Sequence, residues 1–212
     1  MKIADYAEAR PPFAVPHGGR QPEEQQRDPA VILTEFMRAM GMPEDAHTAR
    51  TPERVVKAWE HRLSGYAFDP ASHLDVRFPV EGDPGLVSVT GIRFASTCAH
   101  HLLPITGTAT VAYRPDADMG QVVGLSKLSR VFEGYARRLQ VQEQLGAQTA
   151  DALNDRLRPE GAVVVITAEH GCMTIRGVQQ PGTVTTTVST SGGWTTSSAD
   201  VREVLAEHRA SL

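Results

Sequence analysis

Two short clusters of soft metal ligands lie far apart in the chain. The first cluster is Cys98-Ala99-His100-His101, and the second is His170-Gly171-Cys172. Two cysteine sulfurs and one imidazole nitrogen suit zinc, and three protein ligands leave one coordination position for water. Zinc lowers the pKa of a bound water molecule to about 7, which makes a nucleophile available at neutral pH. The residue types therefore predict a metal centre that activates water, if the fold brings the clusters together.

Other interpretations of these residues stay open on spacing alone. The spacing is not that of a standard zinc finger, so the clusters could be a chance grouping. A closed structural zinc site, with His100 or His170 as the fourth ligand, is a second alternative. Cys98 and Cys172 are the only cysteines. They could also be two buried free thiols, or one disulfide in a secreted protein.

The composition indicates a soluble globular protein. The chain has 212 residues, of which 41% are apolar and 22% charged, enough for one domain with a core or a small core with helical extensions. No stretch approaches the roughly 20 apolar residues of a membrane span, and residues 1–10 lack the apolar run of a secretory signal. A net charge of −4 argues against nonspecific nucleic-acid binding. We therefore expect a cytoplasmic protein with neither a membrane nor a nucleic acid as partner.

The texture of the sequence divides the chain into three parts. Prolines, glycines and a polar run at the start offer no periodic apolar face, which is typical of a flexible tail. Helical signals follow, and alternation with β-branched residues begins near Leu86. We predict a flexible tail over residues 1–27, a helical region over 28–84 and a catalytic domain over 85–212.

Two helices are predicted in the second part by one signal, a capping residue followed by proline. The first begins at Asp28-Pro29 and should end at Gly41. The second begins at Thr51-Pro52, and apolar residues at helical spacing carry it to Gly65.

The third part predicts strands, then helices, then strands again, which is an α+β pattern. The predicted strands cover residues 87–94, 106–113, 162–168, 174–178 and 183–189, with a turn at Pro181-Gly182. The predicted helices are one capped by Ser126, one over about residues 141–157 and one from Ser198 to about His208.

Longer stretches of the chain resemble the GTP cyclohydrolase I family. The similar stretches are TPERVVK from Thr51, CAHHLLP from Cys98, GLSKLSR from Gly124, RRLQVQE from Arg137 and HGCMTIRG from His170. They follow the order of the family over about residues 31–192. The resemblance implies the tunnelling fold, an antiparallel sheet with two helices on one face, in which subunits pool their sheets into a barrel. It also implies a homodecamer with active sites at subunit junctions.

The resemblance also implies a reaction and its machinery. The family hydrolyses GTP to 7,8-dihydroneopterin triphosphate and releases C8 of the purine as formate. Motif by motif, its zinc ligands fall on Cys98, His101 and Cys172, and its catalytic histidines fall on His100 and His170. Such imidazoles can move protons near neutral pH.

The substrate contacts that the resemblance implies fall into two groups. Guanine recognition falls on Gln142 and Glu143, and a carboxylate can accept from the ring N–H and the exocyclic amine together. Ser126 and Lys127 open a predicted helix, where free amides favour phosphate. Without the resemblance, each of these would be interpreted as an ordinary surface residue. The residues implied for the triphosphate are Lys57, Ser126, Lys127, Arg130 and Arg176, with Arg54 as a further candidate.

Two positions depart from the family pattern. The first is Ala99, where the family motif normally reads Cys-Glu-His-His. A carboxylate beside a metal can orient a ligand or move a proton. The stretch before the cysteine, often Phe-Tyr-Ser, is Phe94-Ala95-Ser96 here. The leading hypothesis is a zinc-dependent GTP cyclohydrolase. The alternatives are a specialised paralogue that only opens the ring of a guanine nucleotide, and a weakly catalytic nucleotide-binding scaffold.

Overall fold

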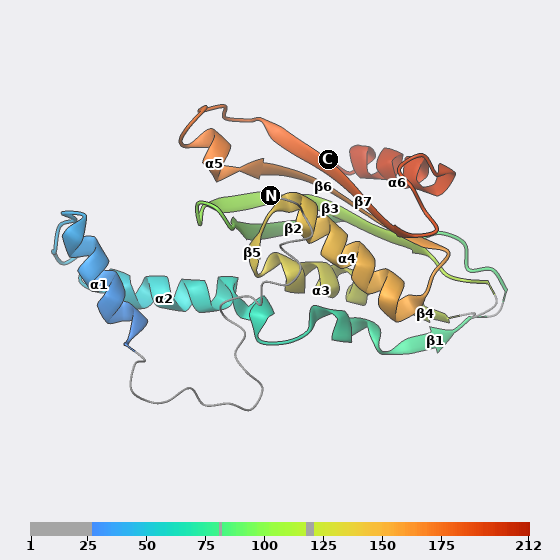
Figure 1. The fold of residues 1–212 in the computed structure, drawn as a ribbon, viewed down its shortest axis with the longest axis horizontal. Coiled ribbons are helices and arrows are strands. Elements are labelled where there is room, and N and C mark those ends of the chain that lie inside the picture. The colour runs from blue at the N-terminus through green and yellow to red at the C-terminus, as the bar shows by residue number, and fades with distance from the viewer. Residues whose placement is uncertain (1–26, 81, 118–120) are drawn as a thin grey trace, which may run out of the picture. The chain divides into compact units, whose positions relative to one another are not determined.

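The computed structural model describes residues 27–80, 82–117 and 121–212, in two compact units that meet between Ala67 and Phe68 (Figure 1). The division lies earlier than the boundary predicted after residue 84, because the short helix η4 (Pro70–Leu74) packs on two helices of the second unit. Nearly all of the predicted tail lies outside the described residues.

The first unit is built on two helices, α1 (Pro29–Ala39) and α2 (Thr51–Arg62), followed by the 3₁₀ turn η3 (Ser64–Tyr66). The predicted cap of α1 is confirmed, since the Asp28 carboxylate accepts from the backbone N–H of Ala30 at 2.8 Å. The predicted cap of α2 is wrong. Thr51 is already the first residue of the helix, and Arg50 takes the capping position without a side-chain hydrogen bond.

The second unit contains a five-stranded sheet in the order β5-β2-β3-β6-β7. Every neighbouring pair is antiparallel except β5 and β2, which run parallel over two residues. A second, two-stranded sheet pairs β1 with β4 and was not predicted. The strands are β1 (Arg77–Pro79), β2 (Val87–Cys98), β3 (Pro104–Arg114), β4 (Gln121–Val123), β5 (Leu139–Gln140), β6 (Gly161–His170) and β7 (Val184–Gly192).

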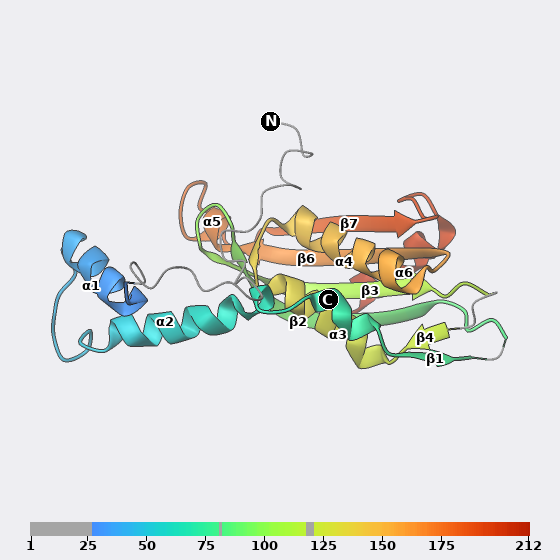
Figure 2. The ribbon, with the colours of Figure 1, turned by 60° about the horizontal axis from the view of Figure 1, so that its bottom comes forward.

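Helices cover both faces of the large sheet. As predicted, two helices, α3 (Leu125–Ala136) and α4 (Gln142–Leu157), lie side by side on one face (Figures 1 and 2). The C-terminal helix α6 (Ala199–Ala210) packs on the other face, within two residues of the predicted bounds at each end, and Ser198 is its N-cap. The apolar run of β6 serves both layers because successive side chains point to opposite faces. Val164 belongs to the core under α3 and α4, and Val165 to the core under α6.

Two local predictions in this unit are wrong. Gly124, not Ser126, is the N-cap of α3. The strand predicted over residues 174–178 is absent, and the short helix α5 (Gly171–Thr174) and a turn occupy this stretch. The apolar residues there, Ile175 and Val178, are exposed, and Gly177 and Gln179 have left-handed backbone angles that bend the chain. Without a neighbouring strand or a core to cover it, this pattern does not form a strand.

No helix in the described ranges is long and apolar enough to cross a membrane.

Candidate metal centre

The sheet register brings the two predicted ligand clusters to the same end of the molecule. Cys98 is the last residue of β2, and the turn that follows leads into β3. Thr97 pairs with Pro104 across β2 and β3, and Ile105 pairs with His170 across β3 and β6. The β2–β3 turn and the end of β6 are therefore neighbours, and both views show α5 beside that turn (Figures 1 and 2).

The β2–β3 turn is tight and closed by backbone hydrogen bonds. The N–H of Cys98 donates to the Leu103 carbonyl at 2.8 Å, and the N–H of Leu102 donates to the Cys98 carbonyl at 2.9 Å. Leu102 adopts a left-handed φ of 58° to close the turn. Such a conformation is uncommon for a residue with a branched side chain, and it occurs most often at functional sites. The turn fixes where Cys98 and His101 stand relative to each other.

Three donor atoms converge at this corner and fit a zinc ion. The ligand atoms of Cys98, His101 and Cys172 all lie within 4.8 Å of one another. Cys98 Sγ lies 3.7 Å from His101 Nδ1. A tetrahedral ion with Zn–S near 2.3 Å and Zn–N near 2.0–2.1 Å needs donors roughly 3.5–3.8 Å apart. The spacing is thus close to what zinc requires, and the donor set of two sulfurs and one imidazole is one that zinc prefers.

The two cysteines are free thiols in different surroundings. Cys98 is buried and Cys172 is half-buried. Burial raises the pKa of the Cys172 thiol, and the neighbouring Cys98 raises it further. A divalent cation between two sulfurs supplies the positive charge that two adjacent thiolates require. The alternative of two inert core thiols does not account for the imidazole beside them.

The two predicted catalytic histidines differ in exposure. The His100 side chain is exposed, and its ring centroid lies 6.1 Å from that of His101. His170 is half-buried at the end of β6, and its Nε2 lies 2.6 Å from Gln142 Oε1. Burial lowers the pKa of His170, while the charge of Glu143 acts in the opposite direction. A half-buried imidazole of lowered pKa is neutral near pH 7 and can accept a proton.

The start of α4 brings the predicted guanine residues to the same corner. The N–H of Ala99 donates to the Gln140 carbonyl at 2.9 Å, which ties the strand before α4 to the β2–β3 turn. Glu143 is exposed, whereas Gln142 is only 1% exposed. Arg176 is exposed. It lies close enough to Cys172 for its positive charge to lower the pKa of that thiol. We call this group the metal corner: Cys98, His100, His101, Gln142, Glu143, His170, Cys172 and Arg176.

The predicted phosphate residues of α3 are not brought to the metal corner of their own chain. The C-terminal end of α3 lies near it, since Ser96 Oγ donates to the Ala136 carbonyl at 2.7 Å. The N-terminal end lies toward the other end of the sheet, where the N–H of Val123 donates to the Tyr113 hydroxyl at 3.2 Å. At 1.5 Å per residue, Ser126 stands roughly 15 Å farther along the axis than Ala136.

A histidine that sequence reasoning missed accompanies these basic residues. His73 lies in η4, which packs on α3, and its ring makes an edge contact with Phe68. Burial lowers the pKa of His73, and the charges of Lys127 and Arg130 lower it further. No sequence motif contains His73. It lies near Lys127 and Arg130 only because η4 packs on α3 in the folded chain. We call Ser126, Lys127, Arg130 and His73 the basic group.

The two remaining predicted substrate residues, Arg54 and Lys57, belong to the first unit. Both side chains are exposed on α2. Because they are three residues apart, they lie on one face of the helix, so both could contact the same ligand.

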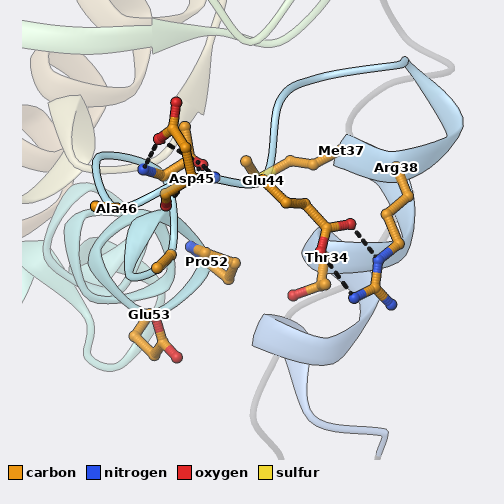
Figure 3. A pocket seen from close by; sticks show the side chains of 10 residues that line it. Thr34, Met37, Arg38, Glu44, Asp45, Ala46, Pro52 and Glu53 are labelled. Carbon is orange, nitrogen blue, oxygen red and sulfur yellow. Dashed lines mark hydrogen bonds and ion pairs between the residues drawn. The ribbon is translucent and has the colours of Figure 1, made fainter.

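A pocket in the first unit lies between α1, α2 and their connection (Figure 3). Its charged side chains form hydrogen bonds and an ion pair that stabilise the connecting loop. Arg38 pairs with Glu44 across the pocket. The Asp45 carboxylate accepts from the N–H groups of His47 at 2.8 Å and Thr48 at 3.1 Å. Because these charges are engaged within the unit, we assign the pocket no ligand.

Comparison with known proteins decides the family. The sequence profile of GTP cyclohydrolase I matches residues 30–209. The chain belongs to the GTP cyclohydrolase I family. It is 44% identical over 195 residues to GTP cyclohydrolase 1 of Mycolicibacterium paratuberculosis, covering 92% of this chain and 94% of the relative. GTP cyclohydrolase 1 of Carboxydothermus hydrogenoformans is 45% identical over 177 residues, covering 83% and 91%.

Family membership confirms the predicted resemblance, the tunnelling fold and the enzyme class, a hydrolase of the GTP cyclohydrolase I type. Among solved structures, the archaeosine synthase QueF-Like in the apo form is similar with a TM-score of 0.42 and 18% identity. That match covers 53% of this chain and 98% of the other.

Proposed function

We propose that this GTP cyclohydrolase I-type enzyme opens GTP at purine C8 and releases formate, forming 7,8-dihydroneopterin triphosphate, with zinc held by Cys98, His101 and Cys172. The observation that carries the proposal is the convergence of these three donors within 4.8 Å at one end of the sheet. Zinc would supply a water molecule of lowered pKa. Three protein ligands leave room for that water, which separates this site from a closed structural one.

The other side chains of the metal corner supply binding and proton transfer. Glu143 presents an exposed carboxylate, which accepts from the ring N–H and the exocyclic amine of guanine, a pair that adenine does not offer. His170 is half-buried and of lowered pKa, so it accepts a proton near neutral pH. His100 is exposed beside His101 and can exchange protons with solvent or with the purine ring.

The triphosphate would be held by the basic group of a neighbouring copy, together with Arg176 of the metal corner and, from α2, Lys57 and Arg54. The orientation of α3 supports a site shared between two copies, because the first turn of α3 lies far from the metal corner of its own chain. The amides of that turn, with Lys127 and Arg130 beside them, favour phosphate. The protein is then a homo-oligomer, for which the family implies a decamer, with active sites at subunit junctions.

A reducing compartment suits this chemistry. Cys98 and Cys172 stand close enough to oxidise together, and a disulfide between them would remove the zinc ligands. The cytosol keeps such thiols reduced. We therefore place the enzyme in the cytoplasm.

The reaction is tested by incubating zinc-loaded protein with GTP while formate release and pterin fluorescence are followed together. Both signals are expected in equal amounts. A changed absorbance without a fluorescent pterin would instead indicate an altered enzyme, which stops after ring opening if no formate is released. Tight GTP binding with neither signal and no change in absorbance would contradict the proposal and support a binding scaffold.

The shared site is tested by mixing two inactive variants. Cys172→Ala removes a metal ligand, and Lys127→Ala removes a member of the basic group. In co-expressed mixed oligomers, up to about a quarter of the junctions would pair an intact metal corner with an intact basic group. Recovery of activity toward that level is expected, together with an oligomeric mass by light scattering. Sites contained within one chain would give no recovery.

A further inference from the structure

The side-chain amide of Gln142 is held on all sides by the sheet. One end of the amide lies 3.2 Å from the Ile166 carbonyl, 3.0 Å from the Thr185 carbonyl and 3.1 Å from Thr187 Oγ1. The other end lies 2.6 Å from His170 Nε2. The side chain is 1% exposed, so it has no room to turn toward solvent. Its orientation is set by atoms of β6 and β7.

These contacts fix which end of the amide is nitrogen. Backbone carbonyls only accept hydrogen bonds, so the end that faces the carbonyls of Ile166 and Thr185 must be the NH₂ group. The reasoning depends on the partners and not on how the two similar atoms were named. The oxygen of Gln142 therefore faces His170. Reversing the amide would set a buried oxygen against two carbonyl oxygens and leave its hydrogens without those acceptors.

An oxygen that only accepts leaves His170 Nε2 one role, that of donor. Neutral imidazole carries one N–H, so the lone pair is on Nδ1. Among the described residues, none forms a hydrogen bond with Nδ1 of this ring. We propose that Gln142 is a positioning residue that fixes His170 as its Nε2–H tautomer and so presents an unprotonated Nδ1 to the site. This rests on the proposed function for the identity of the reaction, though not for the tautomer.

This role differs from the guanine contact that the sequence predicts for Gln142. The amide nitrogen has two hydrogens and already has three acceptors around it, and the side chain is buried. A nucleotide would have to displace sheet contacts to reach it. Glu143, next in the chain and exposed, has none of these ties. Guanine selectivity is therefore assigned to Glu143, and Gln142 acts through His170.

The tautomer is tested directly by ¹⁵N NMR of zinc-loaded protein labelled at histidine, in the solid state because of the size of the oligomer. The spectrum is recorded without nucleotide, above pH 8, where the ring is neutral. The His170 signals are identified by their loss in His170→Gln. We expect a protonated Nε2 and a bare Nδ1. A protonated Nδ1, or an even mixture of tautomers, would overturn the proposal. The spectrum reports the tautomer whether or not the protein turns over GTP. Failure of the tautomer assignment can therefore be told apart from failure of the proposed reaction.

Kinetics test the consequence with a matched pair of adjacent variants. Gln142→Met keeps the length of the side chain but removes the acceptor, and the expected result is a fall in kcat of about 10–100-fold with KM for GTP nearly unchanged. Glu143→Gln should instead raise KM and weaken the preference for guanine. A Gln142→Met variant that raises KM and leaves kcat intact would show a nucleotide contact and sink the positioning role. Zinc content and thermal melting report whether Gln142→Met folds, and if it does not, the wild-type spectrum still decides.

Discussion

Two histidines, His170 and His208, show how one side chain serves different purposes in two regions of the molecule. Burial lowers the pKa of both. His208 of α6 is fully buried, with Nδ1 2.9 Å from Thr110 Oγ1 and Nε2 3.0 Å from Thr167 Oγ1. His170 has one ring nitrogen engaged by Gln142. An imidazole with both nitrogens bonded braces a structure, and one with a nitrogen to spare can move a proton.

The surroundings reinforce the contrast. Thr110 lies on β3 and Thr167 on β6, and Thr167 Oγ1 lies 2.8 Å from Thr186 Oγ1 on β7. His208 thus attaches α6 to a row of threonine hydroxyls on three neighbouring strands, β3, β6 and β7. His170 is the last residue of β6, where the backbone leaves the sheet for the short helix α5. The direction of the pKa shift does not distinguish the two residues, whereas the number of engaged ring nitrogens does.

The largest effect is expected at the metal ligands themselves. Cys172→Ala should lose bound zinc and essentially all formate release, because the activated water depends on the ion. The fold should persist, since Cys172 is half-buried beyond the end of β6. Zinc analysis and the formate assay measure the outcome, with Thr174→Ala of the same short helix as the control. A variant that retained zinc and full activity would refute the ligand assignment.

The next effect separates the two histidines. His170→Ala should lower kcat by about 10²–10⁴-fold, the usual contribution of a general acid–base group, while zinc content stays near that of the wild type. His208→Ala should leave kcat per folded molecule unchanged. Equal losses of kcat in the two variants would abolish the distinction drawn between them.

The converse effect is on stability. His208→Ala should lower the free energy of unfolding by about 2–4 kcal/mol, from the cavity and from two threonine hydroxyls that lose a partner. Denaturant unfolding at a fixed protein concentration measures it. His170→Ala, at the half-buried end of β6, should cost less. The comparison predicts that His208→Ala loses more unfolding free energy than His170→Ala. A larger loss in His170→Ala would contradict it.

The pH dependence of stability follows from the direction of the His208 shift. Its folded pKa lies below the ordinary value of about 6.5, so below that pH the unfolded state binds more protons. Stability should therefore be full above about pH 6.5 and fall as the pH drops through and below it. His208→Gln, which cannot charge, should have a shallower fall between pH 7 and 5. Part of the fall should remain, since the pKa of His170 is also lowered. An unchanged slope would exclude His208 as a source.

The smallest effect is expected at Ala99, where the family pattern has glutamate. Ala99 is exposed in the turn, and its backbone, not its side chain, ties the turn to β5. Ala99→Glu should leave zinc content unchanged and alter kcat by less than about tenfold, the lower end of outer-shell effects. Ala99→Gln separates the charge from the bulk. A rise in kcat of more than tenfold would show that the missing glutamate limits the activity of this chain.

The sequence predicted the parts of the molecule that local chemistry determines. The Asp28-Pro29 cap predicted the start of α1, a continuous apolar run predicted β6, and a run of β-branched residues predicted β7. The two clusters of candidate metal ligands stand out because cysteine and histidine are rare and the clusters are short, and the family resemblance singles out Cys98, His101 and Cys172 among them. Two predictions failed because residue types alone do not decide local structure. Thr174, Ile175 and Val178 favour a strand, but residues 174–178 pair with none of the described strands. Gly124 takes the capping position two residues before Ser126.

Roles that depend on tertiary contacts were beyond local reasoning. Gln142 and Glu143 are adjacent and polar, and nothing in the sequence says that one is buried against β6 and β7 while the other meets solvent. His73 and His208 carry no motif, because their partners lie on other elements. The sequence can name the residue types of a site, but burial and hydrogen-bond partners assign the work that each one does.

The three donors of the metal corner form a gradient of exposure, from buried Cys98 through half-buried Cys172 to exposed His101. An ion entering from solvent would meet the exposed imidazole first and the buried sulfur last. A chelator or a competing metal would likewise approach from the His101 side, where Leu102 holds the turn in a left-handed conformation. The rate of metal exchange would therefore depend on this short turn.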